Sequence, residues 1–138
     1  MTTGDARDRV GIIEWSRRAR GARATELRVA DAYGAAIARA PTGGEKIALA
    51  RAASRHGWHA DLWSSVVPVL HDVDATLAAV DTIDSVADVT QGDDPQAAAD
   101  RTVRDLTAQY RAWLASATPV ADGPTIAVLR LVLGPDGR

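Results

Sequence analysis

The sequence predicts an all-α protein, a four-helix bundle with a long crossover between the second and third helices and a short fourth helix. Three observations support this fold class. Alanine supplies 28 of the 138 residues and phenylalanine none, which favours helices that approach one another closely. Small and apolar residues recur at steps of three and four in three long segments. Groups of Pro and Gly separate these segments, and little except a short Val and Leu run near the end is typical of a strand.

The first helix is expected over residues 8–39. Pro41, Gly43 and Gly44 form a strong stop signal after it. Its inward stripe is predicted to be Trp15, Ala19, Ala22, Glu26, Val29, Tyr33, Ile37 and Ala40.

The second helix is expected over residues 45–70. The carboxylate of Glu45 suits the positive end of a helix dipole, and Pro68 should kink or end the helix. Gly34 and Gly57 lie inside the first two helices, which predicts a close approach of another backbone at each. The inward stripe of the second helix is predicted to be Leu49, Ala52, His56, His59, Trp63, Val66 and Leu70.

The second half of the chain begins with an acidic connection over residues 72–94. A third helix follows over 95–118, because Pro95 suits a first helical turn, and a short fourth helix covers 123–133. We expect one domain over 1–138. The stripe of the third helix is predicted to be Ala99, Val103, Leu106, Tyr110, Trp113 and Ala117.

Three polar residues interrupt the inward stripes. Glu26 lies on the first stripe, and His56 and His59 lie on the second, one turn apart. A carboxylate in a core is costly unless it has a partner or takes up a proton. The group is therefore a metal site, a buried hydrogen-bonded pair, or the remnant of either.

Composition excludes several other classes. Without cysteine there is no disulfide, thiolate metal site or cysteine nucleophile. No apolar run is long enough to span a membrane, and the first residues lack the apolar core of a signal peptide, so we expect a cytoplasmic protein without membrane contact. The net charge is −2, with +4 on residues 1–70 and −6 on residues 71–138, so nucleic acid is not an expected partner.

The segment Ser54-Arg55-His56-Gly57-Trp58-His59-Ala60-Asp61-Leu62-Trp63 resembles the second helix of the ferritin-like (di-iron carboxylate) family, which typically carries Glu-x-x-His. Glu26 matches the glutamate on that family's first helix, and residues 123–133 look like the opening of its last helix. The resemblance implies a ferritin-like bundle that binds metal through Glu26, His56 and His59.

The departures from the family are equally informative. His56 occupies the glutamate position of the motif, the third helix places Asp105 one residue off its stripe, and the fourth helix ends at Leu133 before a second Glu-x-x-His. Half of a di-metal site is therefore missing, and two histidines with one carboxylate remain. That donor set suits one ion of iron, manganese or zinc.

Two functions follow as hypotheses. The first is a ferritin-like metal-binding protein with a reduced site, with a non-haem oxidoreductase or hydroxylase as its activity if the site is catalytic. The second is a non-catalytic helical scaffold or partner subunit derived from such an ancestor. The short last helix would leave an apolar flank uncovered, so we expect a homodimer or a complex with a protein partner.

Overall fold

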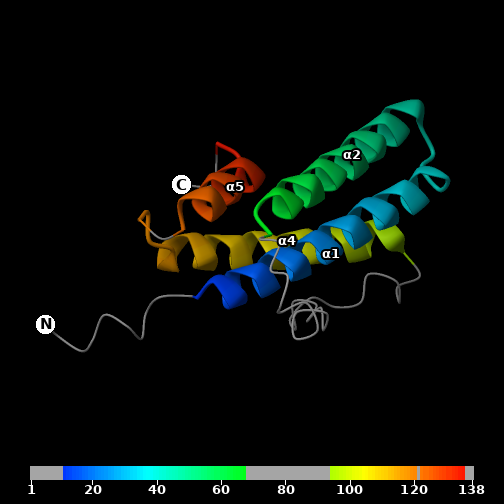
Figure 1. Cartoon of the computed structure of the whole chain (residues 1–138). Coiled ribbons are helices and arrows are strands. Elements are labelled where there is room, and N and C mark those ends of the chain that lie inside the picture. Colours follow the sequence, from blue (N-terminus) through cyan, green and yellow to red (C-terminus); the bar gives the residue numbers. More distant parts are fainter. Residues whose placement is uncertain (1–10, 68–93, 121, 136–138) are drawn as a thin grey trace, which may run out of the picture.

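The computed structural model describes residues 11–67, 94–120 and 122–135. This part of the chain is all-helical and contains no strand, as the sequence predicts (Figure 1). The acidic connection expected at 72–94 lies outside the described residues except for its last position. The helices are α1 (Ile12–Ile37), α2 (Gly43–Ser65), α4 (Pro95–Ser116) and α5 (Gly123–Leu133).

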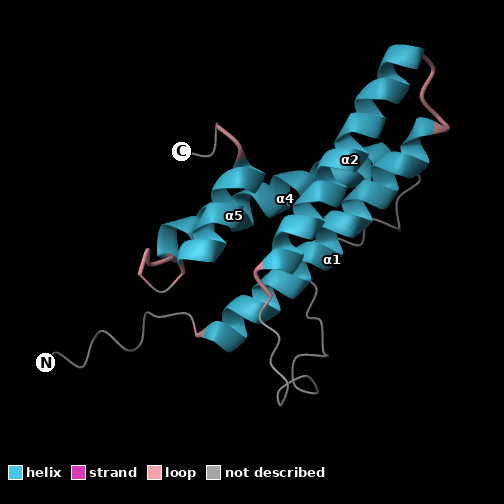
Figure 2. Cartoon of the chain, turned by 45° about the horizontal axis from the view of Figure 1, so that its top comes forward, coloured by secondary structure: helices cyan, strands magenta, loops and turns pink. Residues whose placement is uncertain are grey.

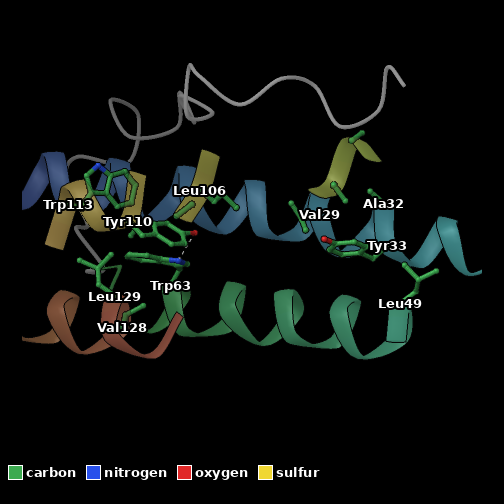
Figure 3. Packing of buried hydrophobic residues seen from close by; sticks show 14 of the residues in the cluster. Val29, Ala32, Tyr33, Leu49, Trp63, Leu106, Tyr110, Trp113, Val128 and Leu129 are labelled. Atoms are coloured by element: carbon green, nitrogen blue, oxygen red, sulfur yellow. Dashed lines mark hydrogen bonds between the residues drawn. The ribbon is translucent and has the colours of Figure 1, made fainter. Parts of the chain in front are cut away.

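The four helices pack together around α1. Helices α2 and α4 both contact α1 and run antiparallel to it, while α5 packs on α4 and touches α2. In both views α5 lies beside the C-terminal end of α2 (Figures 1 and 2), and Figure 3 shows the two helices on the same side of α1 and α4. Helices α2 and α5 therefore share one row opposite α1 and α4.

The ends of α2 differ from the expected 45–70. Thr42 is the N-cap, and Thr42 and Glu45 form a capping box in which each side chain accepts a hydrogen bond from the other's backbone N–H. The helix therefore begins at Gly43, and Glu45 occupies the third helical position. It ends at Ser65 because a residue that precedes proline, here Val67, disfavours helical torsions.

The other helix ends follow the expected signals. The Asp94 side chain caps α4 by accepting hydrogen bonds from the backbone of Gln96 and Ala97, and Pro95 is the first helical residue. Helix α5 ends at Leu133, and its C-cap Gly134 has a φ of 69°, a conformation that favours glycine. Helices α1 and α4 each end two residues earlier than expected, and the start expected at residue 8 lies outside the described residues.

The stripe residues that the structure describes line the core, as predicted, and Leu70 lies outside the described residues. Trp63, Tyr110 and Trp113 lie together at one end, beside Val128 and Leu129 of α5 (Figure 3). The buried apolar residues of the core are Trp15, Ala19, Ala22, Val29, Ala32, Tyr33, Ala36, Leu49, Trp63, Ala98, Ala99, Leu106, Tyr110, Trp113, Val128 and Leu129.

The prediction about the helical glycines is wrong. A Cβ atom built on Gly34 or Gly57 would meet nothing within 4 Å, so no neighbouring backbone approaches either glycine closely. Gly34 faces solvent and Gly57 is partly exposed. The helices around them are stabilised by the packing of other residues.

No helix in the described ranges combines the length and the apolar character that crossing a membrane requires.

Candidate metal centre

The three polar residues of the stripes meet inside the protein. Glu26 is 1% exposed in the middle of α1, where it faces α2. His56 and His59 are buried on α2, and their positions one turn apart place both imidazoles on the face that packs against α1. The predicted convergence of these residues is therefore present.

Both imidazoles face the carboxylate of Glu26 through their Nδ1 atoms. His56 Nδ1 lies 2.5 Å from Glu26 Oε2, and His59 Nδ1 lies 3.4 Å from Glu26 Oε1. The two rings stand edge to face, with centroids 5.3 Å apart. Each carboxylate oxygen thus has its own imidazole, and the Nδ1 atoms point to one locus.

A tyrosine completes the surroundings of the carboxylate. The Tyr110 hydroxyl on α4 donates a hydrogen bond of 2.8 Å to Glu26 Oε1. It also accepts a hydrogen bond of 3.1 Å from the indole Nε1 of Trp63 (Figure 3). The sequence places Tyr110 on an inward stripe but does not identify this partner. The contact depends on how α4 is aligned against α1, which no local pattern specifies.

Burial alone would raise the pKa of the Glu26 carboxyl, because desolvation penalises the charged form. Hydrogen bonds from His56 and His59, together with their positive charge when protonated, outweigh burial and lower that pKa. Glu26 is therefore ionised at neutral pH, as a metal ligand has to be.

A second tyrosine holds the outer side of the site. The Tyr33 ring stacks on His56 at a centroid distance of 5.7 Å, and its hydroxyl donates a 2.7 Å hydrogen bond to Asp100 Oδ1. Burial, the hydrogen bond to Asp100 and the charge of Asp100 raise the pKa of Tyr33. Tyr33 therefore packs against the face of the His56 ring while its hydroxyl is bonded to α4.

The three side chains place possible metal-ligand atoms close together. A ligand atom from each of Glu26, His56 and His59 lies within 4.8 Å of the others. Donors that surround one ion at roughly 2.1 Å lie about 3–3.5 Å apart, so His56 Nδ1 and Glu26 Oε2, which are 2.5 Å apart, would have to separate slightly around an ion. This buried group could hold a metal ion.

The donors for a second ion are missing from the described helices. Asp105 of α4 is exposed and does not join the group, and α5 carries no acidic residue between Gly123 and Leu133. In the part of the chain that the structure describes, the group has three members.

A small pocket of about 200 Å³ opens beside the group. Glu26, His56, His59 and Tyr110 form its polar wall, and α4 and α5 supply its apolar wall. Space for further ligands of an ion therefore exists on the side opposite the helix pair α1 and α2. The sequence gives no sign of this pocket, because its walls come from all four helices.

No model of a known protein family matches the chain, and neither curated proteins nor solved structures show a match to it.

Proposed function

We propose that the protein is a ferritin-like metal-binding protein that holds a single divalent transition-metal ion through Glu26, His56 and His59. The observation that carries the proposal is the convergence of one ionised carboxylate and two imidazoles in a buried locus with a pocket beside it. Two histidines and one carboxylate leave open positions for a ligand on an iron or zinc ion.

An ion bound here would supply Lewis acidity and, if it is iron or manganese, redox chemistry. The chain supplies the surroundings. Tyr110 holds one Glu26 oxygen in place, Tyr33 holds the His56 ring, and the buried location excludes bulk water from the donors. Each imidazole can bind an ion through Nδ1 only when this atom carries no proton. Metal binding therefore moves a proton at Nδ1 to Nε2 or to solvent.

Iron is the first choice for the ion, with manganese or zinc as the alternatives. Intrinsic affinity of such nitrogen and oxygen donors rises from manganese to iron to zinc, so zinc is expected to bind most tightly in a test tube. An oxidoreductase or hydroxylase is the activity that an iron ion in this setting would support.

Metal analysis of untagged protein is the direct test. We expect about one equivalent of metal after purification, and saturable one-to-one binding of Fe(II) without oxygen, of Zn(II) and of Mn(II) in calorimetry. His59→Ala should abolish this binding, because two remaining donors cannot hold an ion tightly.

Asp61→Asn is the matched control, since Asp61 is exposed on the same helix two residues away. It should leave the stoichiometry and affinity unchanged. Metal-free protein that takes up none of the three ions, or equal metal loss in both variants, would refute the proposal.

One observation favours a second function, the non-catalytic scaffold or partner subunit. Glu26 already faces two imidazoles and the Tyr110 hydroxyl, so its buried charge is compensated without an ion. Trp58 adds an exposed aromatic surface on α2, with 48% of the residue accessible. This function predicts no metal and a dimer in light scattering that Trp58→Ala converts to a monomer.

A further inference from the structure

The pocket beside the donors has a distinct chemical make-up. Its inner wall is polar and includes the three candidate ligands, while Val103 and Leu106 of α4 and Val132 and Leu133 of α5 form an apolar wall. A molecule inside it would meet the donor atoms at one end and aliphatic carbon along its length.

Arg55 brings a positive charge to the same pocket. It precedes His56 on α2 and lines both this pocket and a larger cavity of about 540 Å³ between α1, α2 and the start of α4. Among the described residues Arg55 has neither a hydrogen bond nor an ion pair, and its charge acts on Tyr33 only at a distance. Its guanidinium is therefore available to a ligand.

The charges that face the pocket favour an anion once an ion is bound. One divalent ion exceeds the single negative charge of Glu26, and Arg55 adds another positive charge. A carboxylate can reach an open position on the ion with one oxygen and accept hydrogen bonds from a guanidinium with the other.

Volume limits the size of that anion. A space of about 200 Å³ corresponds to roughly seven water molecules at about 30 Å³ each. Ligands of drug size occupy pockets that are larger, from about 300 Å³ upwards. A chain of about three to six carbons fits.

We propose that the pocket binds a short-chain aliphatic monocarboxylate, with its carboxylate between the metal ion and Arg55 and its chain against α4 and α5. This inference rests on the proposed metal site and names the class of molecule that the site accepts. Arg55 is then the residue that selects for the negative charge.

The test uses zinc-loaded full-length protein and three probes in calorimetry or NMR titration. Butyrate should bind, neutral butyramide of the same shape should bind at least about tenfold more weakly, and octanoate should be excluded by its length. Arg55→Met should weaken butyrate binding about tenfold or more, the effect of losing a charge-assisted hydrogen bond. Zinc affinity should stay unchanged in this variant.

Two further variants make the test specific. Arg51→Met removes an exposed arginine one turn away that does not line the pocket, and it should change butyrate affinity less than twofold. Val132→Phe fills the apolar wall and should block butyrate while zinc still binds. Thermal unfolding of each variant establishes that it is folded.

The possible failures are distinguishable. If zinc binds but butyramide binds as well as butyrate, or Arg55→Met behaves like Arg51→Met, the carboxylate proposal is overturned and the metal site stands. If zinc does not bind before any probe is added, the proposed function fails, and this inference fails with it.

Discussion

Glu26 is the residue on which the interior of the protein depends. An acid in a stripe of small and apolar residues would be expelled or neutralised without donors around it. Two imidazoles and the Tyr110 hydroxyl keep it charged and buried. The hydrogen-bonded chain continues from Tyr110 to Trp63, so one polar group orders both the site and the aromatic end of the core.

The decrease of the free energy of unfolding at alkaline pH should depend on Tyr110. Burial, the charge of Glu26 and the hydrogen bond to Glu26 raise the pKa of Tyr110 well above 10 in the folded protein. Above pH 10 the unfolded chain releases this proton while the folded chain keeps it, so the free energy of unfolding falls as pH rises. The slope is about 1.4 kcal/mol per pH unit for one such group.

Urea unfolding between pH 8 and pH 11.5 measures this slope. Tyr110→Phe should remove about that much of it and should lower the free energy of unfolding at pH 8 by about 1–3 kcal/mol, since Trp63 and Glu26 each lose a partner. An unchanged alkaline slope in the variant contradicts the raised pKa.

At the residue scale, the sequence predicted that Glu26, His56 and His59 converge, but it did not predict the residues that contact them. The helical period places Glu26, His56 and His59 on inward faces whatever the exact docking of the helices. The partners Tyr110 and Asp100 lie 84 and 67 residues from Glu26 and Tyr33, so these contacts depend on the alignment of α4 against α1. Arg55 is exposed and gave no signal in the apolar pattern.

Side-chain caps fix the first residues of α2 and α4. Thr42 accepts a hydrogen bond from the backbone of Glu45, and Asp94 does the same for the first turn of α4. Pro and Gly lie near the helix ends, as predicted, but α2 is shorter than expected. Apolar periodicity runs on through Val66, whereas the torsions before Pro68 do not permit a helix.

Removing the cap of α2 should weaken the whole fold slightly. Thr42→Ala loses the side-chain acceptor and should lower the free energy of unfolding by about 1 kcal/mol in urea titration. Thr42→Ser retains the oxygen and should restore most of that loss. Equal destabilisation by both variants would show that the cap is not the cause.

At the scale of the molecule, the all-α class and the packing of four helices were predictable, because alanine content and three apolar stripes allow few alternatives. The position of α5 was not. Its 11 residues are too few to lie along the whole of α2, and it lies beside the C-terminal end of α2 instead (Figure 2). Short apolar segments carry too little pattern to specify such a placement.

Helix α5 should nevertheless contribute strongly to stability. Leu129 is fully buried beside Trp63 and Trp113, and Leu129→Ala should lower the free energy of unfolding by about 2–4 kcal/mol. Leu131 lies on the same helix with 51% of the residue exposed, and Leu131→Ala should cost less than about 0.5 kcal/mol. Chemical denaturation of the two variants side by side measures the difference, and similar losses would contradict the packing of α5.

The three candidate donors all belong to the hairpin of α1 and α2, whereas the aliphatic wall opposite them comes from α4 and α5. The three residues that would hold an ion and the aliphatic residues beside them thus lie in separate halves of the chain, and only Arg55, the proposed charge-selecting residue, lies with the donors on α2. Substitutions in the C-terminal half can therefore change the size and shape of the pocket without altering Glu26, His56 or His59. The same division would allow protein engineers to vary the apolar wall of the pocket while the three polar residues stay unchanged.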